Sequence, residues 1–308
     1  MQPSASPREL VLGTLLALLA IVIWAGWVVV SRFGVTKEVF TALDLTAIRF
    51  GFAGLLLLPW WLKYTKRYTK IDHLRGLVFA ITIGAPFNFL AIQGISYATV
   101  SHAGIIHAMS TVATFGFSLL LMAMKPKKLQ ILGVVCALMG VGVLLLAHDI
   151  GEKTQAFLGY GLFIASGTTW GLYITLLKKW QISALHATVN VAVWSLFLWI
   201  PVYLWMFLTY STDHIPWMAI GFQVFSQSIM TSIVAFVAFS KAVHMLGSTT
   251  ASAFIPLVPV LSTLMGEWFL GEIATPQEWT GIVCIAIGIF MATGALSYLY
   301  RRFLTVRL

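Results

Sequence analysis

The stretch LVLGTLLALLAIVIWAGWVVV, residues 10–30, carries no charged side chain anywhere along its length. A helix that crosses the roughly 30 Å hydrocarbon core of a bilayer needs about 20 consecutive apolar residues. The stretch is longer than the core of a secretory signal peptide, which has about 7 to 15 apolar residues, and it lacks an obvious small-residue cleavage site. It therefore predicts a permanent transmembrane helix.

Similar apolar runs recur along the whole chain. Of the 308 residues, 59% are hydrophobic and 9% are charged, whereas an ordinary soluble domain is roughly 25% charged. This composition excludes long soluble domains and predicts an all-α membrane protein. Apolar runs separated by charged or turn-rich breaks predict ten transmembrane helices, near residues 10–30, 40–62, 76–96, 101–124, 129–147, 157–177, 184–209, 216–240, 249–270 and 277–299.

The basic residues indicate how these helices are oriented. A formal net charge of +9 could suggest a nucleic-acid partner, but the Lys and Arg residues fall in short loops between apolar spans, so we expect no nucleic acid. With the N-terminus in the cytoplasm, all but four of the 19 Lys and Arg residues fall in inner segments, the exceptions being Arg32, Lys37, Lys153 and Arg49. Because basic loops tend to remain in the cytoplasm, both termini are expected there.

The two halves of the chain match each other at a nearly constant shift. A shift of 146 places Trp24-Ala25-Gly26-Trp27 over Trp170-Gly171-Leu172-Tyr173, and a shift of 148 places Gly133 and Gly140 over Gly281 and Gly288. We interpret residues 1–150 and 151–308 as two copies of one five-helix unit. Because five is odd, the second copy must be inverted in the membrane. Inverted repeats give a transporter two related shapes, one open to each side, with the solute site near the midplane.

A wider set of residues forms a recognisable pattern. It consists of Ile23-Trp24-Ala25-Gly26, Thr46-Ala47-Ile48-Arg49-Phe50, Gly171-Leu172-Tyr173, and Thr249-Thr250-Ala251-Ser252 followed by Pro256, Pro259-Val260, Gly266-Glu267, Gly271-Glu272, Gly281 and Gly288. This pattern resembles the drug/metabolite transporter superfamily, in its ten-helix EamA-type branch. The first unit departs from it, with Met109-Ser110-Thr111 where a proline is usual and Lys127-Lys128 where Gly-Glu is usual. The resemblance implies export of small metabolites by an inner-membrane protein, and the chain looks most like bacterial amino-acid exporters.

The usual catalytic motifs are missing from the sequence. It contains no HExxH metal pair, no GxSxG nucleophile turn and no GxxxxGK[ST] phosphate loop. His102 and His107 are five residues apart, which is about 140° around a helix and poor for joint metal ligation. We therefore expect no enzyme activity, no metal and no cofactor. The expected partners are a small-molecule solute and the lipid bilayer, with the protein as a monomer or weak dimer.

Polar and aromatic residues within the spans are candidates for a solute path, because polar groups that face lipid lack hydrogen-bond partners. Aromatic rings in mid-span suit apolar or cationic solutes through stacking and cation–π contacts. Helix-to-helix hydrogen bonding is the alternative for each polar residue, and core packing is the alternative for each ring. The predicted substrate-binding residues are Trp24, Asn88, His107, Trp170, Tyr173, Asn190 and Gln227.

Arg49 lies deep in the second span, where an unpaired charge costs about 2.5 to 3.5 kcal/mol or more. Asp44, five residues earlier, lies about 140° around the helix and is not an ideal neighbour. Either a gate network or a solute carboxylate could satisfy Arg49, and we assign Asp44 and Arg49 to a gate or structural network. Pro256 and Pro259 can bend the ninth span, as a hinge or as a static kink.

These features together predict an inner-membrane exporter that works by alternating access. Amino acids, including neutral and aromatic ones, are the first choice of solute, and cationic or lipophilic drugs are the alternative. The spans offer few ionisable groups, with His107 the central one. This scarcity favours uniport, with proton-coupled transport as the alternative mechanism.

Overall fold

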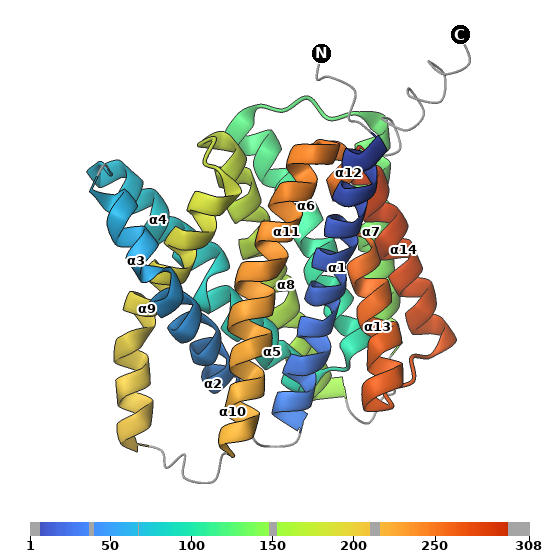
Figure 1. Ribbon diagram of the computed structural model, residues 1–308. Coiled ribbons are helices and arrows are strands. Elements are labelled where there is room, and N and C mark those ends of the chain that lie inside the picture. The colour runs from blue at the N-terminus through green and yellow to red at the C-terminus, as the bar shows by residue number, and fades with distance from the viewer. Residues whose placement is uncertain (1–6, 37–39, 67, 148–152, 210–215, 295–308) are drawn as a thin grey trace.

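The computed structural model describes residues 7–36, 40–66, 68–147, 153–209 and 216–294, and every element in these ranges is helical. Figure 1 shows the helices packed side by side as one bundle. A helical segment covers most of each of the ten predicted spans. The prediction of an all-helical protein is therefore confirmed for the described residues.

The first half of the chain begins with α1 (Pro7–Thr36). Its second span is divided into α2 (Ala42–Ala47), the π-helical η1 (Ile48–Phe52) and α3 (Ala53–Thr65). Its third span consists of α4 (Lys70–Ile83) and α5 (Ala85–Tyr97), which meet at Gly84. A single 3-10 turn, η2 (Val100–Ala103), leads into α6 (Gly104–Met122), and α7 (Lys128–Leu146) follows.

The second half contains α8 (Lys153–Lys179) and α9 (Ala184–Thr209). Its next span is divided into α10 (Trp217–Gln223), the π-helical η3 (Val224–Val234) and α11 (Ala235–Leu246). The short α12 (Ser248–Ser252) precedes α13 (Leu257–Leu270), and α14 (Pro276–Ala292) is the last described helix. The break between α12 and α13 covers residues 253–256 and so includes Pro256, one of the two prolines that predicted a bend in this span.

Length and composition identify which segments can cross a bilayer. Among the described residues, eight helical segments are long and apolar enough, and the shorter apolar α14 and the segment α8 are not in that group. The sequence predicted ten crossings, and eight of these ten segments also meet the criterion of length and hydropathy in the structure. Eight candidate spans already make the chain a multi-pass membrane protein.

Helices α7 and α14 pack closely along a row of glycines. A Cβ atom added to Gly140 would lie 2.6 Å from the carbonyl oxygen of Gly281, and one added to Gly288 would lie 2.7 Å from that of Gly133. Residue numbers rise along α7 as they fall along α14, so the two helices are antiparallel. Their glycines are also the residues that match between the two halves at a shift of 148. Small residues allow this close approach of two backbones within a membrane.

The turns that precede α7 and α14 correct one detail of the sequence comparison. Ala123 and Gly271 both adopt a left-handed conformation, with φ of 48° and 70°. The next residues repeat one backbone hydrogen bond, Met124 N to Ser118 O and Glu272 N to Gly266 O, both 3.3 Å. The shift is again 148, so Ala123 and Met124 occupy the positions of Gly271 and Glu272. The assignment of Lys127-Lys128 to those positions was wrong, because the sequence alone did not locate the turn.

The two ends of the bundle differ in charge. The end of α3, the segment that follows α6 and the end of α8 carry Lys63, Lys125 and Lys178 and lie at the top of Figure 1; we call this the basic end. The opposite end carries Asp44, Glu267, Glu272 and Glu278; we call it the acidic end. Among the residues used to predict orientation, Lys37, Arg67, Arg301, Arg302 and Arg307 lie outside the described residues, as do both termini and the proposed unit boundary at 150 and 151.

Candidate solute site

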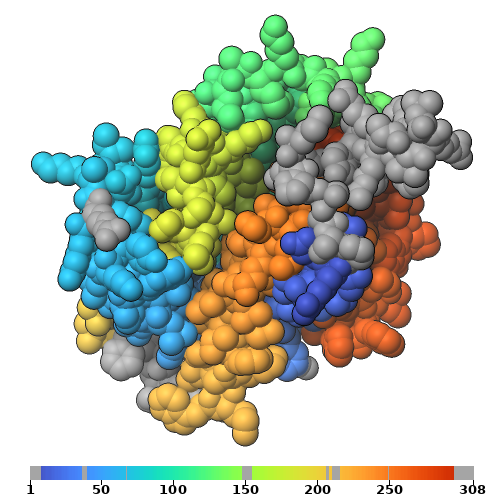
Figure 2. Space-filling view, turned by 45° about the horizontal axis from the view of Figure 1, so that its top comes forward, coloured from blue at the N-terminus to red at the C-terminus, as the bar shows by residue number. Residues whose placement is uncertain are grey.

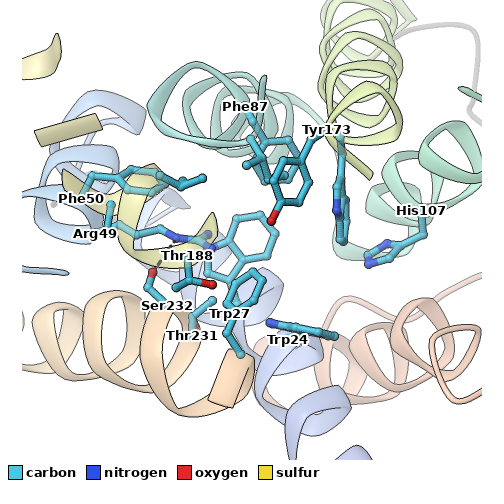
Figure 3. A pocket seen from close by; sticks show the side chains of 15 residues that line it. Trp24, Trp27, Arg49, Phe50, Phe87, His107, Tyr173, Thr188, Thr231 and Ser232 are labelled. Carbon is cyan, nitrogen blue, oxygen red and sulfur yellow. Dashed lines mark hydrogen bonds between the residues drawn. The ribbon is translucent and has the colours of Figure 1, made fainter. Parts of the chain in front are cut away.

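A cavity lies in the middle of the bundle and contains about 700 Å³ of empty space, part of it open to solvent. Figure 3 shows its lining, which comes from both halves of the chain. Figure 2 views the molecule nearer its basic end, where a recess lies between the yellow turn from α8 to α9, the green α6–α7 segment and the orange α11. The lining residues are Trp24, Trp27, Arg49, Phe50, Ile83, Phe87, His107, Trp170, Tyr173, Thr188, Val191, Ala192, Thr231, Ser232 and Phe236.

Two pairs of aromatic residues form much of the cavity wall. Trp24 and Trp27 come from α1, and Trp170 and Tyr173 come from α8, at positions related by the shift of 146. Phe87 joins the pairs, because its ring lies 6.4 Å from that of Trp27 and 5.5 Å from that of Trp170. The cavity therefore has flat apolar faces contributed by equivalent helices of the two halves.

Close packing of α6 and α8 holds the second aromatic pair in place. A Cβ atom added to Gly171 would lie 2.5 Å from the Cβ of Ala113 and 2.7 Å from the Ser110 carbonyl oxygen. The missing side chain at Gly171 thus allows α8 to lie directly against α6. On the facing helix, His107 points into the cavity and its ring lies 5.4 Å from that of Trp170, edge to face.

Arg49 is the cationic residue of the cavity, and it is 8% exposed. Its Nε donates to Ser232 Oγ at 3.1 Å, and its Nη1 donates to Asn88 Oδ1 at 2.7 Å. The guanidinium carbon lies 5.1 Å from the Trp27 ring centre and 5.5 Å from that of Phe50. Within the described part of the chain, no carboxylate lies within ion-pair distance of Arg49. The described partners of its charge are therefore neutral oxygens and aromatic faces alone.

Two π-helical segments bring Arg49 and Ser232 together. Ser228 Oγ donates to the Ile48 carbonyl oxygen at 2.7 Å, which joins η3 to η1. Within η3, Ser232 Oγ donates to the Gln227 carbonyl oxygen five residues earlier. A π-helical turn is wider than an α-helical turn and is often found at functional sites. Here the two wide turns face each other beside the cavity.

The structure separates the seven predicted substrate-binding residues into two groups. Trp24, His107, Trp170 and Tyr173 line the cavity. Asn88, Asn190 and Gln227 are buried but are not in its lining.

Each member of the second group holds other protein groups. Asn88 binds Arg49 and also donates to Thr46 Oγ1 at 3.1 Å, so it supports the cavity from behind. Asn190 accepts from Trp61 Nε1 at 3.1 Å and donates to Tyr68 Oη at 3.3 Å, which joins α9 to α3 and to the turn before α4. Gln227 donates to Ser31 Oγ at 3.0 Å and joins η3 to α1.

Several lining residues were not predicted from the sequence. They are Trp27, Phe50, Ile83, Phe87, Thr188, Val191, Ala192, Ser232 and Phe236. Trp27 could have been found, because it matches Tyr173 in the repeat. The others are small, hydroxyl-bearing or apolar, and such residues occur on every face of these helices.

Asp44 does not take part in the Arg49 network. Its Oδ2 accepts from Thr41 N at 2.8 Å and from Thr41 Oγ1 at 2.7 Å, so it caps the start of α2. It also lines a second cavity, which contains about 960 Å³ of empty space between η1 and α9, part of it open to solvent, and whose described lining is otherwise uncharged. This cavity shares Phe50 with the central one, so the Phe50 ring lies between the two spaces.

Pro256 and Pro259 lie away from the lining of the central cavity. Pro256 immediately precedes the first turn of α13, and Pro259 is buried within that helix. Gly104 at the start of α6 faces Pro259, because a Cβ atom added there would lie 3.3 Å from the proline Cβ. Pro259 thus lies in the contact between α13 and α6.

An ion pair joins three segments at the acidic end. Arg32 Nε lies 2.6 Å from Glu272 Oε1, and Arg32 Nη1 donates to the Ile95 carbonyl oxygen at 2.7 Å. Glu272 Oε2 accepts from Val100 N at 2.9 Å. These bonds join the last turns of α1 and α5 to the loop between α13 and α14, at the end of the bundle opposite the basic loops.

Comparison with known proteins identifies the class of molecule that contains this cavity. The sequence matches the EamA-like transporter family over residues 11–146 and again over residues 157–294. The chain belongs to this family. An EamA transporter is a membrane transporter of the drug/metabolite transporter superfamily, so the chain is not an enzyme. The double match supports two duplicated halves.

Individual relatives of this EamA transporter cover nearly the same length. An uncharacterized transporter of Archaeoglobus fulgidus is 28% identical over 292 residues, which cover 91% of this chain and 96% of that protein. The threonine/homoserine exporter RhtA of Escherichia coli K12 is 24% identical over 266 residues, 83% of this chain and 81% of RhtA. One chain of known crystal structure superposes with a TM-score of 0.60 at 18% identity, covering 94% of this chain and 98% of that chain. That likeness shows a shared fold.

Proposed function

We propose that this EamA transporter carries small zwitterionic solutes, amino acids first, out of the cell across the bacterial inner membrane. The observation that supports this most is the make-up of the central cavity. Aromatic faces from α1 and α8 surround it, and its described lining contains one guanidinium and no carboxylate. A zwitterion places its carboxylate near Arg49 and its ammonium over an aromatic face, where cation–π attraction stabilises it.

A cationic or lipophilic drug is the second candidate, because the walls are mostly apolar. A cation in this cavity would meet the charge of Arg49 with no carboxylate in the lining to offset the repulsion. The distant similarity to RhtA, described as a threonine/homoserine exporter, also favours amino acids. The zwitterion is therefore the better fit.

We further propose that the two halves are inverted five-helix units that open the cavity to each side in turn. The antiparallel packing of the equivalent helices α7 and α14 supports this arrangement. The cavity between equivalent helices α1 and α8 supports it as well, since transporters of this kind bind solute at the interface of their repeats. The basic end supports placing both termini in the cytoplasm.

Flux through purified protein tests the proposal. We expect proteoliposomes to release preloaded, labelled neutral amino acids down their gradient, and protein-free liposomes to retain them. A labelled aromatic amine of similar size serves as the cationic comparison and should move more slowly. The absence of flux for every amino acid in the panel would refute the leading assignment, and faster movement of the amine would favour the drug exporter.

The same vesicles test the mechanism. A uniporter moves solute only down the solute's own gradient, so a pH gradient imposed at equal solute concentrations should produce no net flux. Net accumulation under the pH gradient alone would show proton coupling instead.

A further inference from the structure

We infer that Arg49 binds the carboxylate of the transported solute, with the indole N–H of Trp27 as a second donor. This inference rests on the proposed function and identifies the anchor of the same site. The sequence led us to assign Arg49 to a gate or structural network. Its contacts in the structure, however, leave part of the guanidinium free to bind a ligand.

The first argument is the charge of Arg49 itself. Burial of a cation is costly unless it is paired or well hydrogen-bonded. Arg49 is 8% exposed, and its two protein acceptors, Ser232 Oγ and Asn88 Oδ1, are neutral. Arg32, by comparison, pairs with Glu272. An arginine that serves only to hold helices together would more simply have such a carboxylate partner.

The second argument is the number of donors that remain. A guanidinium has five N–H groups in a planar fork suited to a carboxylate. Two donor atoms, Nε and Nη1, bind the protein, and no hydrogen bond from Nη2 is found among the described residues. Trp27 Nε1 is buried without a hydrogen-bond partner, although the ring lies directly beside the guanidinium. A carboxylate between these two side chains would satisfy both of them.

The third argument is that the guanidinium is held in one place. Asn88 donates to Thr46 Oγ1, and this bond fixes the amide so that its oxygen faces Arg49. Ser232 Oγ in turn donates to the Gln227 carbonyl oxygen, which leaves its lone pairs for Nε. A group oriented before binding loses little freedom when the ligand arrives. The Arg49 guanidinium is therefore preorganised for binding an anion.

The ligand chemistry follows from the rest of the cavity. A small inorganic anion would leave the faces of Trp24, Trp170 and Tyr173 without contact. A carboxylate attached to an ammonium and a modest side chain can fill the space between Arg49 and His107, which Figure 3 shows on opposite sides of the cavity. Among carboxylates, an amino acid can therefore contact both the Arg49 guanidinium and the aromatic residues of the cavity wall.

A pair of solutes that differ only in the carboxylate tests this inference. We would compare a labelled neutral amino acid with its primary amide, which has the same side chain and ammonium but no anion. Replacing the carboxylate by an amide removes the ion pair and its charged hydrogen bonds, which lowers affinity by about tenfold to 100-fold. The wild-type protein should therefore prefer the amino acid over the amide by about tenfold or more.

Substitution then assigns the preference to a residue. Arg49→Gln should raise KM for the amino acid and bring the ratio of amino acid to amide close to one, while Arg49→Lys should keep part of the preference because the charge remains. Arg75→Gln is the matched control, since Arg75 pairs with Asp72 away from the cavity, and it should leave the ratio unchanged. Trp27→Phe keeps a ring and removes the N–H, so it should lower the ratio by about threefold.

The outcomes separate this inference from the proposed function. Wild-type flux of amino acids and amides with equal KM would overturn the role of Arg49 and leave amino-acid transport standing. A folded Arg49→Gln variant with an unchanged ratio would overturn it too. If Arg49→Gln does not fold, the wild-type ratio and the Trp27→Phe variant decide the question. A wild-type protein that moves no amino acid refutes the proposed function itself.

Discussion

At the scale of single residues, some buried polar side chains in this bundle face the cavity and others join helices, and the sequence cannot distinguish the two roles. Arg49 and His107 face the cavity, whereas Asn190 is enclosed by Trp61, Tyr68 and the backbone of its own helix. Both kinds of residue occur in mid-helix among apolar neighbours. What separates them is the rotation of each helix about its axis, and packing between helices determines that rotation.

Asn190→Ala should therefore lower stability and leave solute binding almost unchanged. The substitution removes the acceptor of the Trp61 indole and leaves a partly buried donor unsatisfied, at a cost of about 1 to 3 kcal/mol. Thermal unfolding of the purified protein should show a lower Tm, while KM in proteoliposomes stays within about twofold of wild type. Asn190→Asp keeps an acceptor oxygen and is the comparison. A large rise in KM with an unchanged Tm would instead return Asn190 to the solute path.

At the scale of helices, the contact between α7 and α14 depends on missing side chains. Gly140 faces the backbone of α14, and an added Cβ would lie 2.6 Å from the Gly281 oxygen and 2.8 Å from Ile285 N. Gly142 lies two residues further along the same helix, and nothing lies within 4 Å of its added Cβ. The two glycines thus have the same local structure and opposite surroundings.

Gly140→Ala should destabilise the protein and Gly142→Ala should not. Backbone atoms cannot move aside as a flexible side chain does, so forcing the helices apart at Gly140 costs about 1 to 3 kcal/mol. At Gly142 the alanine gains up to about 1 kcal/mol of helix propensity. Thermal melting of both purified variants measures the difference. Equal Tm values for the two variants would contradict the packing described here.

The sequence predicted the helices better than their interruptions. Ten apolar runs placed ten segments, because the length of an apolar run is a property of the sequence alone. The π-helical turns at Ile48–Phe52 and Val224–Val234 could not be predicted, since they arise from contacts between segments distant in the chain. For the same reason the repeat identified Trp24, Trp170 and Tyr173, whose equivalence is visible in the sequence, and gave no signal for Thr188 or Phe236.

At the scale of the whole molecule, an ion pair joins helices at one end of the bundle and has no counterpart at the equivalent positions of the other end. Arg32 pairs with Glu272 at the acidic end. The shifts that relate the halves place Lys178 at the position of Arg32 and Met124 at the position of Glu272. The basic end therefore has the cation of this pair without the anion, and Lys125, Lys127 and Lys128, which follow Met124 in the chain, add further positive charge at this end. Under the proposed alternation, an ion pair stabilises closure of the acidic end only.

This asymmetry predicts that the resting protein favours the shape that is open at its basic end, and that charge changes at either end shift the balance. Glu272→Gln removes the ion pair and keeps an acceptor for Val100 N, while Met124→Glu places an anion at the position that corresponds to Glu272. A partly buried ion pair contributes about 1 kcal/mol, so each change should shift the ratio of the two shapes by about fivefold in the same direction. The two sites lie at opposite ends, so the double variant should show the product of both effects.

Labelling of a cavity cysteine by an impermeant thiol reagent measures this ratio. Thr188→Cys provides the reporter in a protein whose Cys136 and Cys284 have been replaced by alanine. From the acidic end, each charge variant should be labelled up to about fivefold faster than its parent, because the shape open at that end is the minor one. From the basic end, each should be labelled more slowly, by a smaller factor, because the shape open there is the major one. Met124→Gln is the matched control, because it adds polarity without charge and should label like the parent. If Met124→Glu behaves like Met124→Gln, the unequal ends do not bias the alternation, and the equivalence of Met124 with Glu272 has no consequence for transport.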